Sequence, residues 1–453
     1  MTQQSPPDPF SDQSFIGPAP PESSAPRDSS VFRIFRNSGW LLGGKTVGAL
    51  LSLVYLALIT HSLGPAGFGT FALIFSFAQL ISGLVAFQTW QIIIRFGTPH
   101  VLEKRHDRFA QLVMLCLAFD FASFIVGAVI MGIGTFALGA YYGWTSNFSW
   151  FVLSFNLVIL IASRATAAGI LRVHDNYRDA ALGDTLVPVI RFVGILAAVA
   201  WTPTLTNFLI VWAVSEIVPT LLMWFMIIRT VRMPLRQQSI KRLGQYYRDC
   251  PGIGRFAAFS NIGSSMRLAN QQLVVVIVGL YTGATAAGFF RLGHQLGQVL
   301  ARIADGFGFV LFTEYNRISH TEGHDAVRSL VAKTIRVAGI GALILTAILI
   351  FAGKAILINV FGADFAPAYP LVVLLGGAAA LQVAAVALEP VLLSRGQAGQ
   401  TLIANALGAG ALLILIPFLL AKYGAVGAAT AVLIATITTT AWLVKVYTAT
   451  QKD

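Results

Sequence analysis

Charged residues are scarce in this chain of 453 residues. Only 11% of its residues are Asp, Glu, Lys or Arg, less than half of the roughly 25% found in an average soluble domain. Hydrophobic residues account for 56%, and the mean hydropathy is +0.74. A soluble fold of this length needs more surface charge, so the composition excludes an ordinary soluble enzyme, a disordered protein and a coiled coil. It predicts an all-α polytopic membrane protein.

The sequence also has few cysteines and lacks the common nucleotide-binding motifs. The two cysteines, Cys116 and Cys250, cannot make a disulfide framework. The sequence has no Walker lysine motif, no G-x-G-x-x-G opening a helix after a strand, no H-E-x-x-H and no C-x-x-C. Its seven histidines are scattered and form no metal constellation. We therefore expect no cofactor and no ATP-driven transport by this chain alone.

The first 30 residues differ from the rest of the chain. They are rich in Pro, Ser, Gln and Asp and hold seven of the 18 prolines. Such a segment cannot bury apolar surface, so we expect residues 1–30 to be a disordered cytoplasmic tail. A basic start followed by an apolar stretch is missing, which argues against a signal peptide.

Apolar runs of helical length then alternate with short polar breaks that contain turn residues such as Gly64-Pro65, Gly283 and Gly362. A bilayer core of about 30 Å needs about 20 residues of helix. Twelve runs meet this requirement: 39–60, 69–91, 110–138, 148–171, 181–201, 205–228, 254–280, 285–316, 333–352, 366–392, 400–420 and 423–447. The sequence therefore predicts about twelve transmembrane helices.

The 31 basic residues are distributed unevenly between the two sides of these helices. If the first helix starts in the cytoplasm, 23 of them lie on the cytoplasmic side and two, Lys354 and Lys422, lie outside. Six fall within predicted helices. The positive-inside rule then explains the net charge of +12 and places both termini in the cytoplasm, so no nucleic-acid partner is expected.

The two halves of the chain resemble one another. At a constant offset of 219 residues, Gly64, Gly69, Phe71, Leu73 and Gln79 coincide with residues of the same type. With six helices each, both halves enter the membrane from the same side, as in transporters whose lobes rock about a central cavity. We expect an N-terminal lobe over 31–229, a basic connector over 230–253, a C-terminal lobe over 254–447 and a short cytoplasmic tail over 448–453.

Twelve charged residues fall inside predicted helices. On insertion scales each costs about 2.5–3.5 kcal/mol near the helix centre, so most must face protein or water. The bases are Lys45, Arg164, Arg191, Arg267, Arg291 and Arg302, and the acids are Asp120, Asp184, Glu216, Asp305, Glu314 and Glu389. Because the predicted helices contain six bases and six acids, internal ion pairing is an alternative to a charged cavity. Arg302 with Asp305, and Arg164 with Asp120 or Glu216, are examples.

A polar stripe runs along the eighth predicted helix. Its members fall within an arc of about 100°: Arg291, His294, Gln295, Gln298, Arg302 and Asp305. The stripe either packs on another polar helix or lines a wet cavity, and we favour the cavity. Arg suits phosphate because its planar fork binds two oxygens at once. We expect an anionic, phosphorylated substrate to bind Lys45, Arg191, Arg267, Arg291, Gln295, Gln298 and Arg302.

Several segments resemble a known family. They are Asn37–Lys45, the L-G-P-A-G-F-G element within Leu63–Leu73, Gly169–Asp175, Ala287–Leu292 and Tyr423–Ala429. Together they resemble bacterial Wzx-type polysaccharide and O-antigen flippases of the multidrug/oligosaccharidyl-lipid/polysaccharide exporter superfamily, over roughly residues 33–447. His61 departs from the pattern, since the family often has Arg just before the glycine element.

The resemblance implies a bacterial inner-membrane flippase with two six-helix lobes. Such a protein would move an undecaprenyl-pyrophosphate-linked oligosaccharide between leaflets by alternating access, for lipopolysaccharide or exopolysaccharide biosynthesis. Its partners would be membrane lipids, the polysaccharide polymerase and glycosyltransferases. Members are thought to use ion gradients, and we expect Asp120 or Asp305 to take up the coupling ion because buried carboxylates accept a proton or cation.

Four alternatives remain open, one of them a non-transporting membrane scaffold, which would leave the polar stripe unexplained. A drug exporter of the same superfamily would favour acids in its cavity, whereas the eighth helix has two Arg to one Asp. A flippase for a lipid-linked peptidoglycan precursor usually has fourteen helices. A membrane glycan polymerase or ligase would carry a sizeable external loop, and none of the predicted external loops exceeds about fifteen residues.

Overall fold

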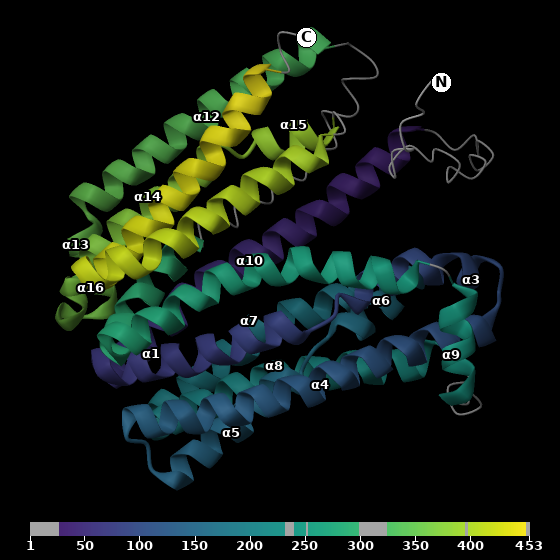
Figure 1. The fold of residues 1–453 in the computed structure, drawn as a ribbon, viewed down its shortest axis with the longest axis horizontal. Helices are drawn as coiled ribbons and strands as arrows, with labels where there is room; N and C mark the ends of the chain where they lie inside the picture. The colour runs from purple at the N-terminus through teal and green to yellow at the C-terminus, as the bar shows by residue number, and fades with distance from the viewer. Residues whose placement is uncertain (1–26, 232–239, 251, 299–323, 395–396, 450–453) are drawn as a thin grey trace, which may run out of the picture. The chain divides into compact units, whose positions relative to one another are not determined.

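The computed structural model describes residues 27–231, 240–250, 252–298, 324–394 and 397–449 (Figure 1). These ranges are almost entirely helical and contain no strand, so the all-α prediction is confirmed. The chain divides into two compact units, Met1–Gly44 and Lys45–Asp453. In the first unit the described residues, 27–44, are helical. Every contact given below lies within the second unit.

The helices follow the order of the predicted passes. The elements are α1 (Arg27–Val85), α2 (Thr89–Ile92), η2 (Ile93–Gly97), α3 (Thr98–Leu102), α4 (His106–Tyr142), α5 (Ser146–Ile161), α6 (Ala165–Val173), α7 (Tyr177–Trp201), α8 (Leu205–Thr230), α9 (Ile240–Asp249), α10 (Ile253–Thr282), α12 (His324–Phe351), α13 (Gly353–Phe361), η4 (Ala363–Ala368), α14 (Tyr369–Ala384), α15 (Leu388–Ser394) and α16 (Ala398–Ala449). Residues 284–298 form a further helix.

Glycines in left-handed conformations reverse the chain between successive passes. Gly64 divides α1 with a φ of 64°, and Gly424 divides α16 with a φ of 58°. Gly143, Gly283 and Gly362 end α4, α10 and α13 with φ values of 67°, 91° and 104°. Only glycine takes such angles without a Cβ penalty. Because alternate passes run in opposite directions, all five turns lie at one end of the bundle, which we call the glycine end. The opposite end is called the basic end.

The divided helices account for the predicted number of passes. Among the residues that the structure describes, eight helical segments are long and apolar enough to cross a membrane, and two of them, Leu51–Leu102 and Gly399–Ala449, contain a glycine turn and so cross twice. The helix α10 and the helix that begins at residue 284 supply the other two. Of the eighth predicted helix, 285–316, the structure describes the part up to residue 298. The chain is a multi-pass membrane protein.

Three predicted helices are interrupted, so the expectation of continuous helices over 69–91, 148–171 and 366–392 was wrong. Non-helical breaks occur at residues 86–88, 162–164 and 385–387. Within a bilayer such breaks persist where protein groups satisfy the freed backbone. The Thr220 hydroxyl does this at one break, since it donates to the Ala162 carbonyl at 2.9 Å.

Packing within the second unit follows the helix order. The neighbouring helices α7 and α8 lie side by side in the N-terminal half, and α14 packs between α12 and α16 in the C-terminal half (Figure 1). At the glycine end one hydrophobic cluster includes residues of both halves, among them Phe68 and Phe71 with Phe361 and Phe365. The halves therefore share a core at this end.

The two halves touch at equivalent glycines. Gly69 and Gly288, which are 219 residues apart, pack backbone against backbone: a Cβ at Gly288 would lie 2.8 Å from Cα of Gly69. A Cβ at Gly69 would meet the Ala284 carbonyl. No side chain larger than hydrogen fits either position without movement. The repeat predicted from sequence therefore has a physical counterpart at the seam between the halves.

Candidate functional site

An aromatic cluster joins two of the predicted site arginines. The Cζ of Arg191, on α7, lies 3.8 Å from the ring centroid of Trp212 on α8. The Cζ of Arg291, from the C-terminal half, lies 5.0 Å from the ring centroid of Phe75. The rings of Phe75 and Trp212 are 5.3 Å apart. One buried aromatic cluster therefore carries an arginine from each half.

Arg191 is the more deeply buried of these arginines, with 8% of the residue exposed. Its Nη2 donates to Glu216 Oε1 at 2.7 Å, and its Nε donates to the Ser215 hydroxyl at 3.1 Å. Tyr55 adds a longer contact, 3.5 Å from Nη1 to the phenol oxygen. The close packing of α7 and α8 brings these groups together. An acid inside the protein thus balances the Arg191 charge.

Glu216 has a second basic partner. Arg164 Nη1 lies 3.1 Å from Glu216 Oε2, and Arg164 Nε lies 3.7 Å from Asp184 Oδ1. The pair of Arg164 with Glu216 is one of the internal pairings left open by the sequence, and the structure contains it. Two bases and two acids therefore form one network within the N-terminal half. Arg164 occupies the break between α5 and α6 rather than a helix.

Arg291 lies in a different electrostatic setting. It is half-buried, and its Nη1 donates to the Gln272 amide oxygen on α10 at 2.7 Å. The amide oxygen orients the guanidinium. Gln295 and Gln298 follow on the same helix face toward the basic end, and both are half-buried. The described part of the stripe is thus partly accessible along its length.

Four predicted site residues have side chains that the structure does not describe. The side chains of Lys45 on α1 and Arg267 on α10 fall outside the described part of the structure. Arg302 and Asp305 belong to residues 299–323, which the structure does not describe. Their roles remain predictions.

Asp120, on α4, lies beside two helix breaks. The Thr166 hydroxyl is 2.5 Å from Asp120 Oδ2 and 2.9 Å from the Thr89 hydroxyl. Thr89 opens α2 and Thr166 lies in the first turn of α6, so both follow a break directly. Further along the same face of α4, a Cβ at Gly127 would meet Val85 and Leu160, at the ends of α1 and α5. The assignment of Asp120 to ion coupling remains a prediction.

Several residues of the site escaped the sequence reasoning. Tyr55, Phe75 and Trp212 are apolar or aromatic residues inside membrane helices, where nothing separates them from ordinary core residues. Gln272 was overlooked although it follows Asn270 and Gln271 in the same predicted helix. The one available signal was the spacing of Phe71 and Phe75, which places both rings on one helix face.

Comparison with known proteins agrees with this architecture. The fold and the buried polar network define a polytopic membrane protein. A model of the polysaccharide biosynthesis protein family matches residues 34–312, and the chain belongs to this family. The inner membrane protein YghQ of Escherichia coli (strain K12) is 28% identical over 347 residues, which cover 76% of this chain and 97% of that protein.

Solved structures share the fold at low sequence identity. An inward-facing MATE-family multidrug resistance transporter of the MOP superfamily has a TM-score of 0.64 at 13% identity, with 91% of this chain and 95% of that chain covered. The lipid II flippase MurJ, in an inward closed conformation, has a TM-score of 0.63 at 12% identity, with 90% and 87% covered. The twelve-helix architecture and the resemblance noted in the sequence are confirmed.

Proposed function

We propose that this protein moves a polyprenyl-pyrophosphate-linked oligosaccharide across the bacterial inner membrane by alternating access, for polysaccharide biosynthesis. One observation carries the proposal: arginines from both halves, Arg191 and Arg291, lie on a single aromatic cluster at the seam between the halves. A group bound there touches both halves, so its binding energy can act on their relative movement. The family membership supports the polysaccharide context.

The two arginines take different roles in this proposal. Arg191 is neutralised by Glu216 and holds Trp212 in place. Arg291 donates to Gln272 and is the proposed ligand for the pyrophosphate, because a guanidinium binds two phosphate oxygens at once. Gln295 and Gln298 extend the polar surface for sugar hydroxyls. Lys45, Arg267 and Arg302 complete the cationic lining.

The contacts at the glycine end support alternating access. His61 Nε2 lies 3.1 Å from the Val360 carbonyl, and the Tyr142 hydroxyl donates to the Gly279 carbonyl at 2.6 Å. With the glycine contact, these bonds close the glycine end between the halves. We propose that this end faces the periplasm and that both termini lie in the cytoplasm, in agreement with the 23 basic residues that the sequence predicts on the cytoplasmic side.

An ion gradient is the proposed energy source. Asp120, beside two helix breaks, and Asp305 are the proposed acceptors of the coupling ion. Glycosyltransferases and a polysaccharide polymerase are the proposed partners, since they make and consume a lipid-linked glycan.

The experiment is complementation of a strain that lacks this gene, with surface glycan as the readout. Arg291→Ala should lower export about 10- to 100-fold, the usual effect of losing a charge-assisted bond to phosphate. Arg291→Lys keeps the charge but loses the fork and should retain part of the export. Protein abundance in the membrane serves as the folding control. Wild-type export by Arg291→Ala would refute the proposed site.

The same strains distinguish the drug-export alternative. A drug exporter would change susceptibility to cationic compounds while surface glycan stayed constant. A lipid-linked glycan flippase should change surface glycan and leave susceptibility unaltered.

A further inference from the structure

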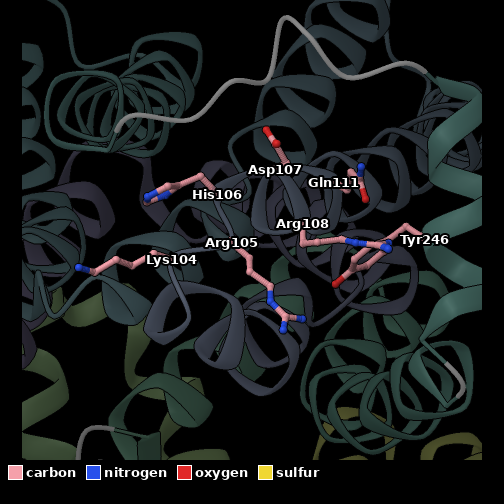
Figure 2. A pocket seen from close by; sticks show the side chains of 7 residues that line it. All are labelled: Lys104, Arg105, His106, Asp107, Arg108, Gln111 and Tyr246. Carbon is pink, nitrogen blue, oxygen red and sulfur yellow. The ribbon is translucent and has the colours of Figure 1, made fainter.

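A pocket at the basic end lies at the start of α4 and takes no part in the proposed transport path. Its volume is about 820 Å³. The lining side chains come from the turn between α3 and α4, the first turns of α4, and α9: Lys104, Arg105, His106, Asp107, Arg108, Gln111 and Tyr246 (Figure 2). Three of these seven are permanently positive and one is an acid.

The turn between α3 and α4 fixes one wall of the pocket. Lys104 has a φ of 56°, in the left-handed region that non-glycine residues seldom adopt. Two backbone bonds hold this conformation: the Lys104 N–H donates to the Val101 carbonyl at 3.1 Å, and the Arg105 N–H donates to the His100 carbonyl at 2.8 Å. Such bonds are those of a left-handed turn that commonly ends a helix. Here it presents consecutive basic side chains to one pocket.

The connector helix α9 supplies the opposite wall. Tyr246 is 1% exposed, and its hydroxyl lies 2.9 Å from His100 Nε2. Arg108 pairs with Asp249 at 2.9 Å. Burial raises the pKa of the Tyr246 hydroxyl well above its ordinary value, so the group stays neutral and can donate a hydrogen bond. Figure 2 shows Arg108 extending toward Tyr246, so both walls meet at this point.

The ion pairs around the pocket are solvated and exchangeable. The side chains of Arg105 and Glu103 are 63% and 50% exposed, and those of Arg108 and Asp249 are 45% and 41% exposed. Exposed pairs contribute little stability, so the oxygens of a phosphate group can replace either acid. Segments 95–111 and 240–255 together hold eight basic and three acidic residues, a formal excess of five positive charges.

The pocket lies at the level of the membrane surface. Leu102, two residues before Lys104, is 77% exposed, and Tyr247 on α9 is also exposed. The apolar part of α4 begins at Phe109, between the pocket residues Arg108 and Gln111. Apolar side chains exposed next to basic ones are typical of a surface that touches acyl chains and headgroups together.

We propose that this pocket binds the phosphate headgroup of an anionic phospholipid and thereby fastens α9 to α4. A basic pocket at the membrane surface suits such a headgroup, whose phosphate accepts bonds from Arg105 and Arg108 while its acyl chains lie against Leu102. A bound lipid anchors the connector between the two halves to the bilayer. The proposal does not depend on what the protein transports.

The experiment measures the thermal unfolding midpoint of the purified full-length protein in detergent, using its tryptophan fluorescence. Short-chain phosphatidylglycerol is titrated against phosphatidylcholine of the same chain length. We expect a saturable rise of the midpoint with phosphatidylglycerol only, reduced at 1 M NaCl because the Debye length falls to about 3 Å. Equal stabilisation by both lipids would overturn the proposal.

Three variants locate the binding. Lys104→Gln/Arg105→Gln should weaken phosphatidylglycerol binding about thirtyfold, since each basic side chain near an anionic membrane surface contributes roughly fivefold. Lys104→Arg/Arg105→Lys keeps both charges and should bind as the wild type. Lys354→Gln/Lys422→Gln removes two exposed charges at the glycine end and is the matched control. Equal weakening in this control would overturn the site.

A further titration distinguishes binding of a lipid from binding of free phosphate. Millimolar inorganic phosphate or pyrophosphate should give less than a tenth of the shift, because the acyl chains add apolar contact. If phosphate alone reproduced the full shift, the pocket would be a site for a soluble anion and the lipid proposal would be wrong. If Lys104→Gln/Arg105→Gln failed to fold, the charge-preserving variant and the control would still test the charge requirement through their salt dependence.

Discussion

Replacing Glu216 by leucine removes the acid between two arginines in the membrane. Arg191 and Arg164 then lose their partner at 2.7 and 3.1 Å while they stay mostly buried, with side-chain exposures of 10% and 20%. Removing one member of a buried ion pair costs about 3–5 kcal/mol, because the remaining charge is left uncompensated. We expect Glu216→Leu to lower the free energy of unfolding by about this amount.

The assay is equilibrium unfolding of the purified protein in mixed micelles, with membrane abundance as a second readout. The matched control is Glu103→Leu, whose pair with Arg105 is at least half exposed and should contribute at most about 1 kcal/mol. In the double variant Glu216→Leu/Arg191→Leu the buried cation is gone as well, so the loss should be smaller than the sum of the single losses. If Glu216→Leu lowered the free energy of unfolding by no more than Glu103→Leu does, the reasoning that Arg191, Glu216 and Arg164 form a buried network would be refuted.

Two further predictions concern the glycine end. Gly69→Val should keep the halves from meeting, because its Cβ would overlap the Ala284 carbonyl, and export in the complementation assay should fall at least tenfold; Gly132→Val, with open space around its Cβ, is the control and should export normally. A reporter enzyme inserted after Tyr142 should show periplasmic activity, since the turn at Gly143 lies at the glycine end; cytoplasmic activity there would reverse the proposed orientation.

The order of most transmembrane passes could be predicted from sequence, because it depends on local hydropathy and on the turn residues between passes. Hydropathy over about 20 residues marks each pass, and glycine or proline marks the reversals at Gly64, Gly283 and Gly362. The helix breaks could not be predicted. Ala86 and Ala162 favour helix and are apolar, and what stabilises a break, such as the Thr220 bond to Ala162, comes from a distant helix.

The candidate site was predictable only in part. A polar stripe that includes Arg291 follows from helical periodicity. Whether a given arginine faces an acid depends on how helices pack, and with equal numbers of intramembrane bases and acids the sequence leaves both outcomes open. Arg191 meets Glu216 because α7 lies against α8, and Arg291 donates to Gln272 because the helix that begins at residue 284 lies against α10. The domain boundaries remain predictions, as do the roles of Lys45, Arg267, Arg302 and Asp305.

The contact between Gly69 and Gly288 suits an origin of the two halves by gene duplication. Residues in equivalent positions of two repeats touch each other here, which is the arrangement found on the axis of a two-fold symmetric homodimer. A gene that encoded one six-helix half could therefore have given a working dimer before duplication and fusion. In the fused chain the two positions mutate independently. Their packing still couples them, since a larger residue at one must be accommodated by the backbone at the other.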